Sequence, residues 1–207
     1  MKRAVTALPL IGVVLLLALA VWRSWLQRRR YGSRGVFFFQ SSRWQEKLRD
    51  ASGVLLMVLL IGQAAVAAVS PSSGPSDAAS AHPGRLFWNV TGAVMLFGGI
   101  ALFVVAVLDL GASWRIGIDE GSRPGLVTDG FYRFCRNPIF FAILIFLIGY
   151  TLLLPSRLSV LLLIGAFIGI RAQVLTEEAY LSRTYGDAYR AYARRVGRFV
   201  PRVGRLR

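Results

Sequence analysis

Apolar runs separated by short polar segments are the main pattern of the 207-residue chain. They cover residues 4–22, 51–70, 86–110, 138–154 and 158–175. A helix needs about 20 mainly apolar residues to cross the hydrocarbon core of a bilayer. The pattern therefore predicts an all-α integral membrane protein with about five transmembrane helices.

The first apolar run also has features of a secretory signal peptide. Lys2 and Arg3 resemble the charged start of such a peptide, and Ala18-Leu-Ala20 resembles a cleavage site. The following segment, residues 23–50, is rich in arginine, and basic loops of this kind stay on the cytoplasmic side. We therefore favour a retained first span and keep the signal peptide as the alternative.

The last two apolar runs predict a helical hairpin. Pro155-Ser-Arg157 separates them and predicts a tight external turn. The second helix of the hairpin is expected to continue to Tyr185 and to end at Gly186, because glycine favours the position after a helix. Asp187 then caps a short interfacial amphipathic helix, which Pro201 ends.

Three local features refine this picture. Gly165-Ala-Phe-Ile-Gly169 is a G-x-x-x-G motif, which predicts close helix packing in lipid. Ser42 followed by Gln45 fits a capping box, so a short helix is expected to start there. Asp109 lies near the inner end of the third run, where we expect a helix-end residue meeting water or an arginine rather than a catalytic acid.

Charge gives the expected orientation. The chain is 55% hydrophobic, with a mean hydropathy of +0.55 and a net charge of +15. Its basic residues gather in segments 23–50 and 111–138 and in the C-terminal tail, which share one side if there are five spans. The positive-inside rule then predicts an external N-terminus and a cytoplasmic C-terminus. Since the arginines lie between spans, we expect no nucleic-acid partner.

Metal, disulfide and histidine chemistry are not expected. Cys135 is the sole cysteine, so it has no internal disulfide partner. His82 is the sole histidine and lies in a Pro/Gly/Ser-rich segment. We therefore predict no metal site and no His-based catalysis.

Charged residues of both signs are expected to meet at the cytoplasmic end of the hairpin. Arg136, and with it Arg133, comes from one side, and Glu177 and Glu178 come from the other. Two carboxylates, a guanidinium and an apolar cleft suit S-adenosylmethionine, whose sulfonium and ammonium are cationic and whose carboxylate is anionic. From composition alone, an ordinary ion pair between two helix ends is the favoured interpretation, because ion-pair networks also gather at helix ends.

Two segments resemble a known superfamily. Gly125-Leu-Val-Thr-Asp-Gly-Phe-Tyr-Arg-Phe-Cys-Arg-Asn-Pro-Ile-Phe140 resembles the first signature of the isoprenylcysteine carboxyl methyltransferase and phospholipid methyltransferase superfamily. The second signature is similar to the segment from Glu177-Glu178 through Leu181, Tyr185-Gly186, Tyr189, Tyr192 and Val196 to Pro201. The resemblance covers roughly residues 90–203. It departs from the strictest pattern at Asn137, which replaces His as in bacterial-type members, and at Phe140, which replaces Tyr.

The resemblance implies a membrane methyltransferase that converts S-adenosyl-L-methionine to S-adenosyl-L-homocysteine. The expected cofactor-binding residues are Leu126, Val127, Gly130, Tyr132, Arg136, Asn137, Pro138, Phe140, Glu177 and Glu178, with Gly125 in the adjoining loop. Arg171 or Arg115 is expected to hold an anionic acceptor at the catalytic centre. Residues 86–207 would form the catalytic core, and residues 1–85 an N-terminal two-span region with a basic cytoplasmic loop.

The expected acceptor is a lipophilic small molecule or a lipidated group that enters from the bilayer. Carboxylate is favoured, because its charge and that of the sulfonium cancel in the transition state, while amine and thiol stay open. The expected location is a bacterial inner membrane, and the sequence makes no prediction of oligomeric state. A sterol-type NADPH reductase and an inactive membrane scaffold are the alternative functions.

Overall fold

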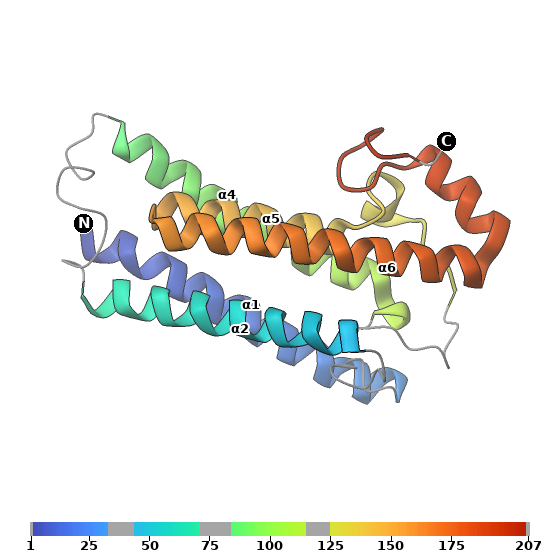
Figure 1. Cartoon of the computed structure of the whole chain (residues 1–207), viewed down its shortest axis with the longest axis horizontal. Coiled ribbons are helices and arrows are strands. Elements are labelled where there is room, and N and C mark those ends of the chain that lie inside the picture. The colour runs from blue at the N-terminus through green and yellow to red at the C-terminus, as the bar shows by residue number, and fades with distance from the viewer. Residues whose placement is uncertain (1, 33–43, 71–83, 115–124, 206–207) are drawn as a thin grey trace.

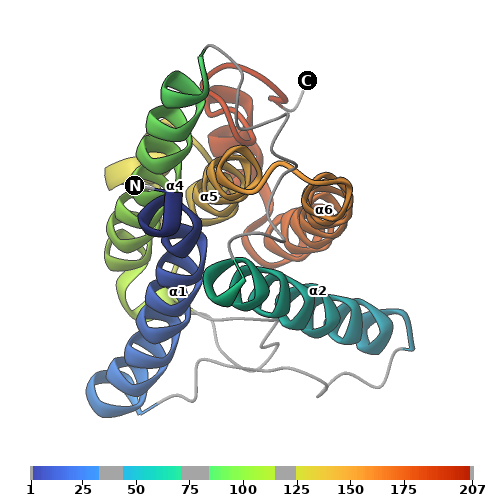
Figure 2. The same cartoon turned by 90° about the vertical axis from the view of Figure 1, so that its left-hand side faces the viewer.

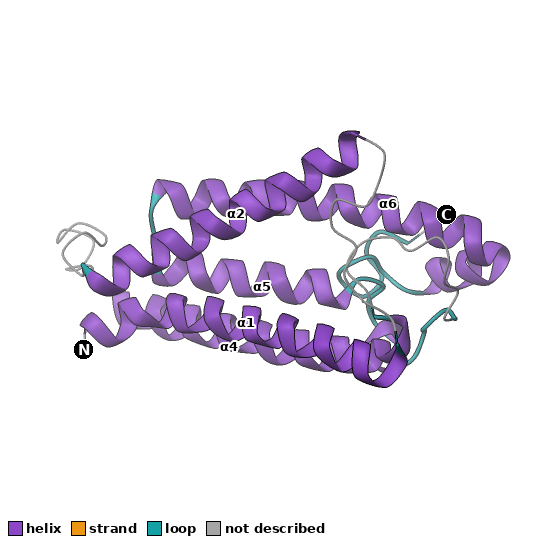
Figure 3. Cartoon of the chain, turned by 90° about the horizontal axis from the view of Figure 1, so that it is seen from below, coloured by secondary structure: helices purple, strands orange, loops and turns teal. Residues whose placement is uncertain are grey.

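The structure, a computed structural model, describes residues 2–32, 44–70, 84–114 and 125–205. The elements form an elongated helical bundle (Figure 1). In chain order they are α1 (Lys2–Tyr31), α2 (Trp44–Val69), α4 (Arg85–Leu110), the 3₁₀ turns η2 (Gly111–Ser113) and η3 (Gly130–Arg133), α5 (Pro138–Leu153) and α6 (Arg157–Arg195). Within the described ranges no segment is drawn as a strand (Figure 3).

The helices have the lengths and composition of a membrane protein. α1, α2, α6 and α4 with its 3₁₀ extension are each long and apolar enough to cross a membrane. α5 is shorter, at 16 residues, and apolar throughout. Seen end-on, α5 lies between α4 and α6, with α1 and α2 below (Figure 2). The prediction of an all-α membrane protein with about five spans is confirmed.

One apolar cluster joins all five long helices. It contains Val13 of α1, Leu60 of α2, Leu96 of α4, Phe146 of α5 and Leu162 of α6. The two N-terminal helices therefore share their core with the helices that carry the signatures.

The first two helices are longer than hydropathy indicates. α1 does not end near Trp22 but continues to Tyr31, because arginine and glutamine favour helices and Arg23 and Gln27 point inward to the end of α4. α2 starts at Trp44 as one continuous helix rather than as a short helix before a span. The predicted cap at Ser42 lies outside the described residues.

Glycines bring α4 and α5 into close contact. A Cβ on Gly99 would lie 2.6 Å from the Phe146 backbone nitrogen, and Gly149 is equally crowded by Leu96. Among the described residues, Gly165 and Gly169 do not bring helices into the close contact that the motif predicts. A Cβ at Gly165 would meet Leu56 at 3.9 Å, and one at Gly169 would meet no described atom within 4 Å.

The C-terminal third follows the predicted hairpin. Ser156 caps α6 by accepting a hydrogen bond from Ser159 N, directly after the turn that begins at Pro155. Gly186 breaks α6 as expected, with φ 51° and ψ −122°. The helix ends at Arg195, earlier than the predicted stop at Pro201. The tail then folds back over the segment that precedes α5 (Figure 1).

Candidate functional site

A sharp turn at Gly130 shapes the first signature segment. Its φ of 58° lies in the left-handed region that favours glycine, and a Cβ there would collide with the Asp109 carboxylate. Asp109 accepts a hydrogen bond from Phe131 N at 2.8 Å. Asp109 is therefore a helix-end residue, as expected, and it accepts from a backbone amide of η3.

The Arg136-Asn-Pro138 turn pairs with the C-terminal tail. Arg136 N donates to Gly197 O at 2.9 Å, and Asn137 N donates to Arg198 O at 3.2 Å. The Asn137 side-chain amide donates to the same Arg198 carbonyl at 3.2 Å. Pro138 begins α5, where its missing N–H leaves no helical hydrogen bond unmade. Asn137 thus supplies a hydrogen bond at the position where the superfamily pattern has histidine.

Glu178 is the centre of a buried ionic cluster and is 8% exposed. Its carboxylate accepts from Arg136 Nη2 at 2.9 Å and from Arg198 Nη2 at 2.7 Å. These hydrogen bonds join α6, the signature turn and the tail, and the one between Arg198 and Glu178 raises the pKa of the Arg198 guanidinium. An ion pair between two helix ends was one of the two interpretations of the sequence, and Glu178 fits it. Glu178 therefore has a structural role here and needs no ligand as a partner.

Arg136 is fully engaged by protein atoms. Besides Glu178, its Nη1 donates to Ala193 O at 2.8 Å and Val196 O at 2.7 Å, and its Nη2 donates to Gly204 O at 3.0 Å. One guanidinium therefore holds the end of α6 and the tail. The cation that sequence reasoning assigned to a cofactor carboxylate thus has a strong structural role.

Glu177 faces a different environment from its neighbour. It lies in the wall of a large cavity, and Gln173 Nε2 donates to its carboxylate at 2.5 Å. Tyr132 lies in the same wall. Burial, followed by the Glu177 charge, raises the pKa of the Tyr132 phenol. The two adjacent glutamates therefore have different surroundings: Glu178 belongs to the buried ionic cluster, and Glu177 belongs to the cavity wall.

The cavity has a volume of about 1410 Å³ and two chemically distinct parts. Near the signature segments it is lined by polar and aromatic groups that include Tyr132, Asn137, Glu177 and Tyr189. Farther along the helices its wall is apolar, with residues such as Leu17, Leu60, Phe103, Phe146 and Ala166. Such a cavity can hold a polar molecule at one end and a hydrocarbon chain at the other.

The structure brings most of the expected cofactor residues to this cavity. Those in its wall are Leu126, Val127, Tyr132, Arg136, Asn137, Phe140 and Glu177. Gly130, Pro138 and Glu178 are outside the wall and support it. Arg171 is exposed on α6 and does not line the cavity, and Arg115 lies outside the described residues.

Sequence reasoning missed two contributions. Arg198 is the second cation on Glu178, and only the fold of the tail brings it there. The other contribution is the start of α2, whose polar residues Glu46, Arg49 and Asp50 also line the cavity. The sequence does show that polar residues precede the apolar part of α2. It does not show that they lie beside the cavity.

Comparisons with known proteins agree with these signatures. The profile of the phospholipid methyltransferase family matches residues 87–188, a range that includes the Arg-Asn-Pro turn and the Glu pair. A protein-S-isoprenylcysteine O-methyltransferase of Schizosaccharomyces pombe is 36% identical over 81 residues. These two matches support the isoprenylcysteine and phospholipid methyltransferase superfamily for this chain. The aligned stretch covers 38% of this chain and about a third, 34%, of that relative.

One solved structure has a similar fold. It is described as a eukaryotic intramembrane Ras methyltransferase, isoprenylcysteine carboxyl methyltransferase. The TM-score is 0.51 at 16% sequence identity, with 95% of this chain and 88% of that chain covered. The likeness therefore includes α1 and α2, where the sequence has no readable motif.

Proposed function

We propose that this protein is a member of that superfamily and transfers a methyl group from S-adenosylmethionine to a lipid-like or prenylcysteine-like acceptor, most favourably a carboxylate. One observation carries the proposal. Both signature segments border a single cavity that continues into an apolar chamber. Its volume of about 1410 Å³ exceeds the roughly 300–1,000 Å³ typical of small-molecule sites, so it has room for a donor and an acceptor together.

The polar end of the cavity suits the donor. The Glu177 carboxylate has the charge to attract an ammonium or sulfonium group. Phe140 and Tyr132 offer flat surfaces for a purine ring, and Leu126 and Val127 offer apolar ones. When bound, S-adenosylmethionine supplies an electrophilic methyl group on a positively charged sulfur. Glu178 and Arg136 would act by holding this wall in place.

The apolar end suits the hydrocarbon part of an acceptor that enters from the bilayer. Its walls exclude water and lower the local dielectric constant, which favours a reaction in which opposite charges neutralise each other. A carboxylate acceptor needs no general base. Positioning of the two reactants would then account for most of the rate. The roles of Arg171 and Arg115 in holding that carboxylate stay predictions.

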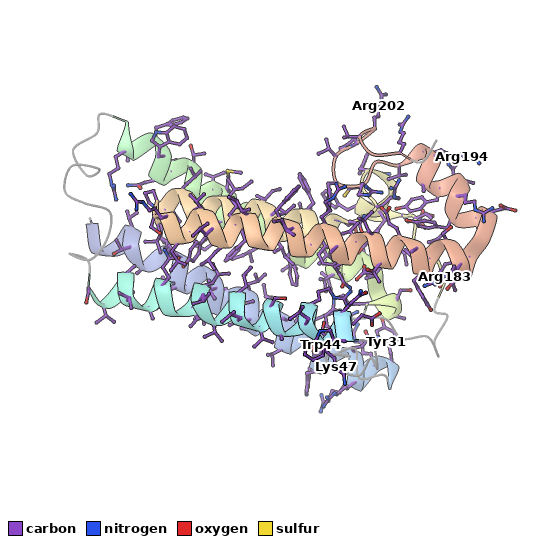
Figure 4. The ribbon with its side chains drawn as sticks, in the orientation of Figure 1. Tyr31, Trp44, Lys47, Arg183, Arg194 and Arg202 are labelled. Atoms are coloured by element: carbon purple, nitrogen blue, oxygen red, sulfur yellow. The ribbon has the colours of Figure 1, made fainter. Side chains whose placement is uncertain are left out.

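The distribution of cations supports a cytoplasmic site. Lys47, Arg183, Arg194 and Arg202 lie at the end of the bundle where the tail covers the signature segment (Figure 4). Basic residues favour the cytoplasmic side of a membrane. We therefore place the donor end of the cavity and the C-terminus at that side. The location in a bacterial inner membrane stays a prediction.

Binding of S-adenosylhomocysteine to the full chain in lipid nanodiscs tests the donor site. At 100 times its Kd, the ligand should stabilise the folded protein by about 2.7 kcal/mol. Thermal unfolding measures this shift, and NADPH should produce none. Methyl transfer is then assayed with N-acetyl-S-farnesylcysteine and with phosphatidylethanolamine vesicles, which separates carboxyl from amine acceptors.

A matched pair of variants makes the test specific. Glu177→Gln should weaken S-adenosylhomocysteine binding by about tenfold, because an amide lacks the charge that attracts the ligand. Asp187→Asn is the control, since its carboxylate is exposed and forms an ion pair with Arg190. Stabilisation by NADPH instead would favour the reductase. A protein that binds neither ligand would favour the scaffold.

A further inference from the structure

Arg23 is an arginine of the first membrane helix whose side chain is almost fully buried, with 2% exposed. Its Nη1 donates to Gln27 Oε1 at 2.7 Å, and its Nη2 donates to Gly111 O. The guanidinium carbon lies 4.8 Å from the centre of the Trp114 ring. Among the described residues, no carboxylate forms an ion pair with Arg23 and its Nε has no hydrogen-bond partner. A buried charge of this kind is unfavourable unless its contacts compensate for it.

The contacts of Arg23 converge on the end of α4. The last carbonyls of a helix lack partners within the helix and carry partial negative charge. Arg23 donates to the carbonyl of Gly111, which directly follows α4 and also accepts from Trp114 N at 3.2 Å, and Gln27 Nε2 donates to Ala112 O at 3.0 Å. Trp114 follows directly in extended conformation, with φ −67° and ψ 128°. Two side chains of α1 therefore fix the backbone on which Trp114 is placed, while the guanidinium stacks on its ring.

Trp114 forms part of the wall of the apolar chamber. It is 2% exposed and packs in a cluster with Phe103 and Ala142. Leu16 and Ile139 pack against the same cluster, and they line the cavity together with Phe103 and Trp114. The indole therefore meets whatever occupies this part of the cavity.

We propose that Arg23 and Gln27 are positioning residues for the acceptor. They hold the Trp114 indole against the apolar chamber and so set the affinity for the acceptor's hydrocarbon part, without touching the donor. The expected effect on acceptor affinity rests on the proposed function. The contacts by which Arg23 and Gln27 hold Trp114, here called the clamp, do not depend on it. The clamp gives the first helix a role in the site.

Tryptophan fluorescence tests the clamp directly. The sequence contains 5 tryptophans, and Trp22, Trp25, Trp44 and Trp88 are exposed while Trp114 is buried. With those four replaced by phenylalanine, the full chain in nanodiscs reports on Trp114 alone. Arg23→Ala should raise quenching of this residue by acrylamide and brominated lipid by about threefold, since the stacked cation is lost. Arg28→Ala removes the same charge from an exposed position of α1 and should change nothing.

Kinetics test the consequence for the acceptor. Arg23→Ala and Trp114→Leu should each raise the KM for N-acetyl-S-farnesylcysteine by roughly five- to tenfold, with the Kd of S-adenosylhomocysteine within about twofold of wild type. Arg23→Lys should be intermediate, because lysine keeps the charge but cannot stack as a planar group. A general loss of structure would instead raise the KM of the acceptor and the Kd of S-adenosylhomocysteine together.

Two results would overturn the inference: unchanged quenching of Trp114 in Arg23→Ala, or a parallel loss of acceptor and donor affinity. If Arg23→Ala does not fold, Gln27→Leu decides by the same readouts, since it removes the hydrogen bonds to Arg23 and Ala112 and leaves the arginine in place. Failure of the wild-type protein to bind S-adenosylhomocysteine would refute the proposed function instead, and the quenching experiment would still decide the clamp.

Discussion

At the scale of single residues, adjacent carboxylates have different tasks. Glu178 accepts charge-assisted hydrogen bonds from Arg136 and Arg198, and it thereby attaches the tail to the turn before α5. Glu177, one residue earlier, lies in the cavity wall. Successive helical residues point in directions about 100° apart, so neighbours in sequence need not share a function. Variants that change both residues at once would mix loss of structure with loss of binding.

Cys135 allows the tail contact to be measured. It is 5% exposed beneath the tail, and its Sγ donates to Arg198 O at 3.5 Å. Burial raises the pKa of this thiol to about 11, so at pH 8 only about one molecule in a thousand carries the reactive thiolate. Glu178→Gln should destabilise the tail by about 2–3 kcal/mol. Iodoacetamide labelling of Cys135 at pH 8 should then rise at least about tenfold, as the thiol returns toward its ordinary pKa.

The sole cysteine makes every label report on one position. Asp187→Asn serves as the control, and its labelling should match wild type. Equal protection of Cys135 in Glu178→Gln would contradict the role of the ionic cluster in holding the tail.

At the scale of elements, the closest helix pair is α4 with α5, and its glycines set the separation. Gly98 and Gly99 are neighbours with different surroundings. A Cβ at Gly99 would lie 2.6 Å from Phe146 N and 2.8 Å from Ala142 O, while one at Gly98 would meet nothing within 4 Å. Gly99→Ala should therefore destabilise the bundle by about 1–3 kcal/mol. Gly98→Ala should be neutral or slightly stabilising, because alanine is the better helix former.

Thermal unfolding of both variants in nanodiscs measures this difference. A Tm for Gly99→Ala equal to that of Gly98→Ala would mean that α4 and α5 can move apart without loss of stability. The comparison is sharp because the two changes are chemically identical and adjacent.

Hydropathy predicted where the helices cross the membrane, because the free energy of burial in lipid depends on composition. It could not predict which glycines pack or where α1 ends, because both depend on the surface of a neighbouring helix. The same pattern of small residues occurs at Gly165 and Gly169, where the described structure provides no close partner. The predicted meeting of Arg136 with the Glu pair is seen for Glu178, which forms an ion pair with it, while Glu177 lies in the cavity wall. Arg198 and Arg23 were not foreseen, since nothing local distinguishes them from the other arginines.

At the scale of the whole molecule, the fold joins a polar site to a membrane-embedded chamber. The signature segments and the tail share one end of the bundle, and long helices extend from there to the opposite end (Figure 1). At that opposite end Tyr150 Oη donates to Leu60 O at 2.9 Å, and Gln63 Nε2 donates to Ser159 Oγ at 2.8 Å. These bonds hold α2 against α5 and α6 at the far end of the apolar chamber, where Leu60 lines it. The chamber therefore has a finite length.

A finite chamber predicts a limit in acceptor chain length. Each methylene that leaves water should contribute about 0.8 kcal/mol, or roughly a fourfold decrease in KM. With a series of N-acetyl-S-alkylcysteines, KM should fall steadily with chain length and then level off when the chain fills the chamber. Ala166 lies in the chamber wall, so Ala166→Leu should move the plateau to shorter chains and leave S-adenosylhomocysteine binding unchanged. Ala172→Leu, at an exposed position of α6 outside the cavity wall, is the control. A KM independent of chain length would show that the acceptor's tail binds elsewhere, and the chamber would then need another occupant.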